Sequence, residues 1–340
     1  MLTIKDDSIL NADYEFCAKQ KYMQCFAGKK VMVIGATGML GTYIINVLCT
    51  YNTLFPKKAC QIIALARGNT KKEFDNDNVF YIKADITTCK TINLDFDFCI
   101  FAAGYTDHRL YTEKPIDIYS VNTIGLHNAL EMARLGRCKR FLFISSSSVY
   151  GSFGTNEIKE NETGLLTSLD YKSVYQESKR MGECICSSFS KQYGMTIKVV
   201  RPFHMYGPGM TFNNSNMVNV FIENLVNKKN IVMYSTGEVL RNFTYLRDII
   251  WQLFLVFLKA DVFDVYNLGS KGNNYRVKDF AEHISRIAGI DIEYKIQSGN
   301  NPTNLNSYCP NLERINKLNT EHIETVTLKN GLLRCLNYWS

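Results

Sequence analysis

The sequence predicts an α/β fold, with a doubly wound Rossmann-type parallel sheet and a smaller C-terminal α/β lobe. Short apolar runs alternate with helical patterns along the first 205 residues, as expected for strands joined by crossover helices. The run Val31 to Ile34 is continuous, which is typical of a strand buried on both faces. Gly35, Gly38 and Gly41 follow it and permit a sharp turn into a helix.

Six strands and three long helices are expected in chain order. Apolar runs predict the strands at residues 31–34, 61–66, 79–82, 96–103, 140–144 and 196–200. Helical periodicity predicts helices directly after the glycine turn, at 120–135 and at 173–189. One further helix, around 14–26, is expected to pack against the main domain. Right-handed crossovers place ligands at the carboxyl ends of such strands.

The pattern divides the chain into three parts. Residues 1–29 are an N-terminal extension to which we assign no chemistry. Residues 30–205, together with about 240–268, are the expected Rossmann domain. From Tyr206 onward turn clusters interrupt the pattern, so residues at about 206–239 and 269–340 are the expected substrate-binding lobe.

Composition excludes several classes of protein. Apolar residues make up 46% and charged residues 21% of the chain, as in globular proteins. The net charge of +7 includes no Lys/Arg block and no apolar run approaches about 18 residues, so we expect neither nucleic-acid nor membrane binding. Eleven cysteines show no CxxC pair and no metal-ligand spacing, which indicates reduced thiols in a cytoplasmic protein and no metal site.

The glycine turn has the chemistry of a phosphate site. Its spacing is GxxGxxG rather than the GxGxxG of the common dinucleotide fingerprint. Glycines let phosphates approach the backbone, and the helix that follows presents free N–H groups and a positive dipole end. A pyrophosphate is therefore the expected ligand of this turn.

Tyr175 and Lys179 are four residues apart in a predicted helix, so they share one face. Tyrosine is a poor base at its ordinary pKa of about 10, but a nearby ammonium favours the phenolate and lowers that pKa. The pair is then able to exchange a proton with a sugar or alcohol hydroxyl. Ser146 follows the strand expected at 140–144 and is placed to hydrogen-bond the same substrate oxygen.

Together these motifs resemble the extended short-chain dehydrogenase/reductases of the nucleotide-sugar epimerase/dehydratase family. The matching segments follow the family's order from about residue 30 to 270. They are the glycine turn, Asp85 with Ile86, Phe101 to Gly104, Asn122, Ser145 to Gly151, Tyr175 to Lys179, Arg201 to Gly209, Arg241 to Asp248 and Tyr266 to Ser270.

The resemblance implies a nicotinamide cofactor, a nucleotide-diphosphate sugar as substrate, and a homodimer built through the helices near 120–135 and 173–189. It implies a catalytic set in which Tyr175 is the base, Lys179 tunes it and Ser146 orients the hydroxyl. Besides Tyr175 and Lys179, the implied cofactor-binding residues are Gly35, Thr37, Gly38, Met39, Leu40, Gly41, Asp85, Ile86, Ala102, Ala103, Gly104, Asn122 and Phe203. The implied substrate-binding residues are Ser147, His204 and Arg241, with Arg241 on the diphosphate.

The end of the second strand departs from the family pattern. Many members carry an acidic residue there, which holds the ribose 2′-hydroxyl. Here the strand ends at Ala66 and Arg67, with Lys71 and Lys72 close behind. A carboxylate repels a 2′-phosphate and an arginine binds it, so Arg67 favours NADP, with NAD as the alternative.

The serine run is a second departure. The family's dehydratases and decarboxylases place a glutamate two residues before the tyrosine of the Val-Tyr pair, often after an aspartate, where this chain has Ser147 and Ser148. The absence of that acid favours a C4 epimerase, with an NADPH-dependent 4-keto-sugar reductase as the alternative. A cofactor-binding sensor without turnover needs only the glycine turn, so the set of Ser146, Tyr175 and Lys179 argues against it.

The sequence leaves two alternative roles open for each of two histidines. His204 stands where many relatives have asparagine, so it is either a neutral hydrogen-bonding substitute, which we favour, or a second acid/base beside the sugar. His108 follows the fourth strand, where a substrate-side loop is expected, and is otherwise a solvated side chain.

Overall fold

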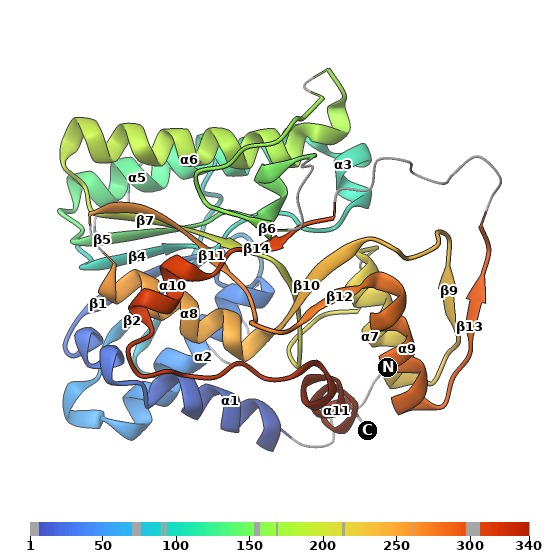
Figure 1. Ribbon diagram of the computed structural model, residues 1–340. Helices are drawn as coiled ribbons and strands as arrows, with labels where there is room; N and C mark the ends of the chain where they lie inside the picture. Colours follow the sequence, from blue (N-terminus) through green and yellow to red (C-terminus); the bar gives the residue numbers. More distant parts are fainter. Residues whose placement is uncertain are drawn as a thin grey trace.

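Seven parallel strands form the central sheet, in the order β11-β7-β5-β4-β1-β2-β3 (Figure 1). The computed structural model describes residues 7–69, 76–89, 91, 94–152, 157–167, 169–212, 215–260, 262–296 and 307–339. The strands are β1 Lys30–Ile34, β2 Gln61–Ala66, β3 Val79–Lys83, β4 Phe98–Phe101, β5 Arg140–Ile144, β7 Ile197–Pro202 and β11 Phe263–Leu268. The order reverses between β1 and β4, and ligands of doubly wound sheets bind at the carboxyl ends beside such a reversal.

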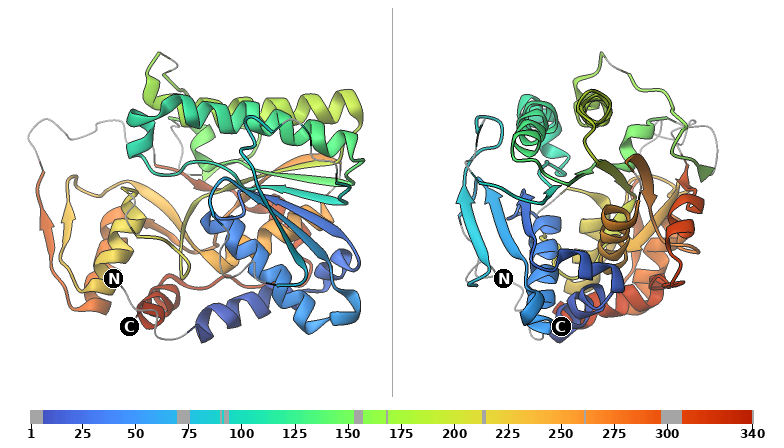
Figure 2. Two further views of the ribbon diagram at one scale, coloured as in Figure 1. Left: turned by 180° about the vertical axis from the view of Figure 1, so that it is seen from behind. Right: turned by 90° about the vertical axis from the view of Figure 1, so that its left-hand side faces the viewer.

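Helices cover both faces of this sheet (Figures 1 and 2). One layer holds α5 (Leu126–Leu135) and α6 (Val174–Tyr193), and the opposite layer holds α2 (Met39–Leu54) and α8 (Leu246–Lys259). Two separate apolar cores fill the spaces between these layers and the sheet. The doubly wound α/β fold expected from the sequence is thereby confirmed.

The side chains of β1 show why its apolar run is continuous. Val31 and Val33 belong to the core beneath α2 and α8, whereas Met32 and Ile34 belong to the core beneath α5 and α6. All four are buried, because successive side chains of a strand point to opposite faces and both faces are covered.

Smaller sheets extend the fold beyond the carboxyl ends of the central strands. Their strands are β8 (His204–Tyr206), β10 (Leu240–Tyr245) and β12 (Asn274–Arg276) in one sheet, with the pairs β9 (Ile231–Met233) and β13 (Ile292–Tyr294), and β6 (Glu157–Ile158) and β14 (Cys309–Pro310). Their helices are α7 (Met217–Asn227), α9 (Val277–Ala288), α10 (Glu313–Leu318) and α11 (Leu328–Trp339). In this way β8, β10 and α7 come to face the edge where a ligand is expected.

The single helix expected around 14–26 is wrong in its extent. The first helix, α1 (Ser8–Ala18), ends earlier, Gln20 is extended, and a separate 3₁₀ turn spans Lys21–Phe26. The Tyr22 hydroxyl donates a hydrogen bond of 2.9 Å to the carbonyl of Trp251 in α8. The break lets α1 pack mainly on α2 while the 3₁₀ turn packs on α8.

The helix expected at 120–135 is helical throughout but not regular. After α4 (Pro115–Ser120) a π-helical turn spans Val121–Gly125, and α5 begins at Leu126. Asn122 in this turn is buried, and its Nδ2 donates to Ser178 Oγ at 2.9 Å. Its Oδ1 has no hydrogen-bond partner among the described residues. Such π turns are frequent at functional sites, and this one carries an implied cofactor-binding residue.

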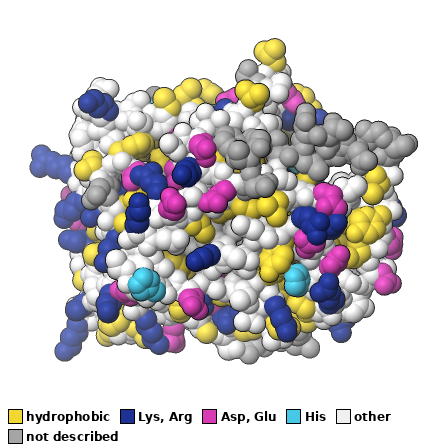
Figure 3. Space-filling model, viewed as in Figure 1, with side chains coloured by type: hydrophobic (Ala, Val, Ile, Leu, Met, Phe, Trp, Pro, Cys, Tyr) yellow, Lys and Arg dark blue, Asp and Glu magenta, His cyan; other side chains and the backbone are white. Residues whose placement is uncertain are grey.

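The described part of the chain contains no helix long and apolar enough to cross a membrane. In the same residues no three His, Cys, Asp or Glu side chains gather where they could hold a metal ion. All eleven cysteines are free thiols. On the face drawn in Figure 3, positive and negative side chains are interspersed rather than gathered into one basic patch.

Candidate active site

The glycine turn lies at the carboxyl end of β1, against the loop that follows β4. Gly35 has φ +86°, and a Cβ there would lie 2.5 Å from the backbone nitrogen of Ala103. A Cβ on Gly41 would lie 2.2 Å from the carbonyl oxygen of Gly35. Gly38 begins α2 in an extended conformation, without a side-chain cap. The turn therefore closes only with glycine, and it leaves the first N–H groups of α2 for a ligand.

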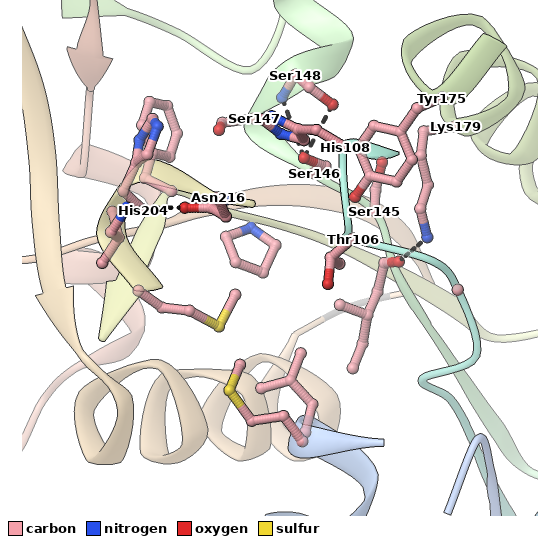
Figure 4. A pocket seen from close by; sticks show the side chains of 18 of the residues that line it. Thr106, His108, Ser145, Ser146, Ser147, Ser148, Tyr175, Lys179, His204 and Asn216 are labelled. Carbon is pink, nitrogen blue, oxygen red and sulfur yellow. Dashed lines mark hydrogen bonds between the residues drawn. The ribbon is translucent and has the colours of Figure 1, made fainter. Parts of the chain in front are cut away.

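A cavity of about 450 Å³ opens at this edge of the sheet (Figure 4). Its walls come from the start of α2, the segments after β4 and β5, α6, and β8, β10 and α7 of the smaller sheets and helices. The predicted site residues that line it are Gly38, Met39, Leu40, Ala102, Ala103, Gly104, Ser146, Ser147, Tyr175, Lys179, Phe203, His204 and Arg241. Implied cofactor-binding and substrate-binding residues therefore share one cavity.

Other predicted residues do not line the cavity. They are Gly35, Thr37, Gly41, Arg67, Asp85, Ile86 and Asn122. Three further residues line the cavity without having been predicted from the sequence: Tyr111 of α3 (Arg109–Glu113), Asn216 before α7 and Tyr308 beside β14. None of them belongs to a motif, although Tyr111 follows His108, for which a substrate-side loop was expected, by three residues.

Ser146 and Tyr175 lie close together at one end of the cavity (Figure 4). Ser146 caps the 3₁₀ turn Ser147–Tyr150, and its Oγ accepts hydrogen bonds from the backbone nitrogen and Oγ of Ser148 at 3.2 and 2.9 Å. Tyr175 is only 8% exposed. Burial raises the pKa of Tyr175, and a hydrogen bond with Ser146 lowers it. The pKa is thus raised rather than lowered as the sequence analysis expected, because burial outweighs the favourable contacts.

Lys179 lies one helical turn after Tyr175 and is buried. Its Nζ donates a hydrogen bond of 2.8 Å to the carbonyl of Ile144 and lies 4.8 Å from the ring centre of Phe143. Burial lowers the pKa of Lys179 to about 7, and the carboxylate of Glu183 works in the opposite direction. The ammonium form therefore dominates below about pH 7 and is lost above it.

A buried ion pair lies beneath Ser146 and Lys179. Arg201 of β7 donates to both carboxylate oxygens of Glu183, from Nε at 2.9 Å and from Nη2 at 2.6 Å. The hydroxyl of Ser145 donates to the same carboxylate at 2.6 Å. The side chains of Arg201 and Glu183 are 8% and 13% exposed. Because Ser145 precedes Ser146, and Glu183 follows Lys179 by one turn, the pair fixes the end of β5 against α6.

His204 and Arg241 line the end of the cavity formed by β8 and β10. The guanidinium of Arg241 lies 5.7 Å from the ring centre of Tyr308, and its Nη1 donates to the carbonyl of Leu240 at 2.9 Å. His204 Nδ1 is buried and has no hydrogen-bond partner in the part of the chain that the structure describes. Burial, together with the nearby positive charges of Arg241 and His108, lowers the pKa of His204 to about 3. His204 is therefore neutral at pH 7, which favours a hydrogen-bonding role over that of an acid.

Arg67 lies beyond the end of β2 and is engaged with two neighbours. Its Nη2 donates to the hydroxyl of Tyr105, and its Nη1 lies 3.6 Å from Oδ2 of Asp85. The side chain of Arg67 is 49% exposed. A 2′-phosphate at this position is attracted by the guanidinium of Arg67 and repelled by the carboxylate of Asp85. The preference for NADP therefore stays a prediction. Lys71 and Lys72 lie outside the described residues.

The residues around the cavity fit a dinucleotide cofactor. The N-terminus of α2 reaches the cavity at Met39 and Leu40 without a side-chain cap, and Asn122 Oδ1 is a buried acceptor without a partner. Lys179 and Arg241 supply two cationic side chains, and no Asp or Glu is among the described residues of the lining. A ligand that carries a pyrophosphate is therefore attracted and meets no carboxylate there.

The doubly wound sheet, the glycine turn and the neighbouring Ser146, Tyr175 and Lys179 define the class of extended short-chain dehydrogenase/reductases. Comparison with known proteins narrows this class. The family model described as NAD dependent epimerase/dehydratase family matches residues 31–269, and the chain belongs to that family. The chain is accordingly an enzyme of the NAD-dependent nucleotide-sugar epimerase/dehydratase superfamily.

Individual relatives are distant. The chain is 24% identical to UDP-glucuronic acid decarboxylase 1 of Xenopus tropicalis, over 98% of this chain and 78% of the relative. It is 25% identical to UDP-glucuronic acid decarboxylase 6 of Arabidopsis thaliana, over 78% and 76%. Two solved structures share the fold, each over 91% of this chain and 98% of the other. They are the UDP-glucose 4-epimerase of Thermotoga maritima with UDP-glucose (TM-score 0.76, 20% identity) and the UDP-glucuronic acid 4-epimerase of Bacillus cereus with UDP-glucuronic acid and NAD (TM-score 0.72, 21% identity).

Proposed function

We propose that the protein epimerises C4 of a nucleotide-diphosphate sugar. A bound nicotinamide dinucleotide supplies a reversible hydride acceptor for this chemistry. Tyr175 in its phenolate form takes the proton of the C4 hydroxyl onto Oη as the hydride leaves C4, and Ser146 Oγ orients that hydroxyl. Lys179, when protonated, stabilises the phenolate form of Tyr175. The 4-keto sugar then rotates to present its opposite face. Tyr175 returns the proton to the oxygen on C4 as the hydride returns to that face of C4.

The observation that carries this proposal is the lack of a carboxylate among the described residues that line the cavity. No Asp or Glu is among the described residues that line the cavity, and Ser147 and Ser148 occupy the turn after Ser146. The family resemblance implies that dehydratases and decarboxylases carry a glutamate at the position of Ser148, often after an aspartate at that of Ser147. Hydride transfer and one proton relay need neither, which favours an epimerase over the decarboxylases to which the chain is similar.

UDP-sugars are the first substrates to test, because the relatives are named for UDP-glucose and UDP-glucuronic acid. The purified protein, incubated with each sugar in turn and with NAD or NADP, should yield the C4 epimer, identified by the proton coupling at C4 in NMR. A substrate that carries deuterium at C4 should give a product that keeps it, because the hydride returns to the same carbon. No net absorbance of reduced nicotinamide should develop.

Other reactions give different readouts in the same assay. A 4-keto reductase consumes one reduced cofactor for each product, a decarboxylase releases carbon dioxide and a pentose, and a dehydratase gives a 6-deoxy sugar. Any of these outcomes contradicts the epimerase, and binding of the cofactor with no product from a panel of UDP-, dTDP-, GDP- and CDP-sugars supports the sensor instead.

We propose that the protein works as a homodimer. Several apolar side chains are exposed on the helical layer that holds α4, α5 and α6, as expected for a surface that a second copy covers. They are Ile116, Tyr119, Ile124, Leu135, Met181 and Tyr193. Light scattering should therefore give twice the chain mass of 38.9 kDa. A cytoplasmic location, expected from the cysteines, stays a prediction.

Replacing Arg67 by alanine should abolish a preference for NADP over NAD. Charge-assisted hydrogen bonds to a 2′-phosphate contribute about 1.5–3 kcal/mol, or roughly ten- to a hundredfold in Kd. Calorimetric titration of both dinucleotides into the wild type and the variant measures this ratio. Asp85→Asn is the matched change, because it removes the repulsion and should tighten NADP alone. Equal or tighter binding of NAD by the wild type overturns the NADP preference.

A further inference from the structure

Tyr111 covers the phenol ring of Tyr175. The two rings are stacked, with their centroids 5.2 Å apart and their planes at 15°. Tyr111 is half-buried and lines the same cavity. Burial raises the pKa of the Tyr111 hydroxyl, and a negative charge on Tyr175 raises it further, so Tyr111 itself stays a neutral phenol. Nothing in the proposed reaction yet uses this ring.

The position of Tyr111 is held from several sides. The ring of His108 lies 5.0 Å from the ring of Tyr111, and α3 packs against the 3₁₀ turn Tyr171–Ser173 that leads into α6. Just before α3, Asp107 accepts a hydrogen bond of 2.9 Å from the hydroxyl of Ser215, which precedes α7. The segment that carries Tyr111 is therefore tied to both the helix of Tyr175 and the opposite wall of the cavity.

The stack has two physical consequences for Tyr175. It restricts rotation of the ring, so that Tyr175 stays beside Ser146 at the same end of the cavity. It also excludes water from one ring face, which disfavours the phenolate. The titratable side chains that line the cavity around Tyr175 are Lys179 on its own helix, and Tyr111 and His108 from α3 and the residue before it. Among these, Tyr111 is the one in ring contact with Tyr175.

We propose that Tyr111 is a positioning residue. Its ring holds Tyr175 beside Ser146, and it closes the end of the cavity at which Ser146 and Tyr175 lie while the 4-keto intermediate is present. The inference rests on the proposed function, in that Tyr175 is the base. In an epimerase the hydride has left C4 and the hydroxyl proton has left for Tyr175 when the intermediate forms. If the ketone escapes at that stage, the cofactor stays reduced and no epimer is produced.

Two substitutions distinguish the contribution of the Tyr111 ring from that of its hydroxyl. Tyr111→Ala removes the stack, whereas Tyr111→Phe keeps it, so only the alanine variant should be affected. In the protein without substrate or cofactor, the Tyr175 signal of a ring-¹³C-tyrosine sample, assigned by comparison with Tyr175→Phe, reports the pKa of Tyr175. This pKa should fall in Tyr111→Ala, because water then reaches the phenolate, and should stay unchanged in Tyr111→Phe.

Turnover provides the second readout. Tyr111→Ala should lower kcat by roughly ten- to a hundredfold, because the base is no longer held in place. Reduced cofactor and free 4-keto sugar nucleotide should accumulate with this variant and not with Tyr111→Phe. Tyr234→Ala is the control, since Tyr234 is 70% exposed and does not line the cavity. Thermal melts of all variants verify that each is folded.

The inference is overturned if Tyr111→Ala leaves both the pKa of Tyr175 and the partition between epimer and reduced cofactor unchanged, or if Tyr111→Phe behaves like Tyr111→Ala. Failure of the proposed function has another signature. In that case Tyr175→Phe keeps its turnover, or the products are not C4 epimers, while the titration of Tyr175 in the Tyr111 variants still reports whether the stack restrains the ring.

Discussion

Tyr175→Phe should lower epimerase turnover by about two to four orders of magnitude, the range that a positioned general acid–base contributes. The variant loses one oxygen atom only. Its ring stays buried and keeps the stack with Tyr111, so the shape of the cavity is unchanged. Affinity for the dinucleotide should persist within a few-fold, because the glycine turn and α2 do not depend on the Tyr175 hydroxyl. Steady-state kinetics and calorimetric titration of the cofactor measure the two quantities separately.

Tyr171→Phe is the matched control for this substitution. Tyr171 precedes Tyr175 by one helical turn, is 53% exposed and does not line the cavity. Its hydroxyl should therefore be dispensable. If Tyr175→Phe keeps turnover within tenfold of the wild type, Tyr175 is not the base, and the proton must pass through another group of the cavity.

The parallel sheet could be predicted because its evidence is local. The inner strands of the sheet are short apolar runs, since helices cover both faces and neither alternate side chain meets water. The edge strand β3 is also an apolar run, although its Phe80 is 60% exposed. The strand 61–66 agrees with β2 residue for residue. The break after Ala18 is different. Apolar residues continue across it, and the chain changes direction because Tyr22 and its neighbours pack on α8, whose sequence is more than 200 residues away.

Local rules also gave the central residues of the candidate site. Tyr175 and Lys179 share a helix face because of their spacing, and Ser146 follows a strand of the central sheet. The walls of the site could not be predicted in the same way. Tyr111 and Tyr308 reach the cavity only because the topology brings α3 and β14 beside α6 and β10, and neither residue belongs to a motif.

The electrostatic state of the site was the least predictable property. A tyrosine one turn from a lysine suggests a lowered pKa, yet the pKa of Tyr175 is raised and that of Lys179 falls to about 7. Both shifts have the same largest cause, which is burial of the charged form. How deeply a side chain is buried depends on the whole fold, so spacing alone predicted which residues share a helix face but not how they titrate.

Breaking the buried ion pair beneath the site should have the largest effect on stability. Arg201→Met removes the guanidinium that holds both carboxylate oxygens of Glu183 and also donates to the carbonyl of Glu160 at 2.9 Å. Among the described contacts, the carboxylate then keeps one hydrogen-bond donor, the Ser145 hydroxyl, and Lys179, whose pKa is about 7, offsets its charge only in part. Leaving such a charge uncompensated costs about 3–5 kcal/mol, so the free energy of unfolding in urea should fall by that amount.

Two further variants show whether the loss comes from the unpaired charge. Arg201→Met combined with Glu183→Leu should recover most of the stability, because apolar residues of similar volume often replace a buried pair at little cost. Arg286→Ala breaks a pair with Glu282 on the surface of α9 and should change stability by less than about 1 kcal/mol. If the single and double variants unfold at the same urea concentration, lost packing rather than the uncompensated carboxylate explains the effect. Recovery in the double variant shows instead that the fold is stable when the Glu183 carboxylate is either paired with Arg201 or removed.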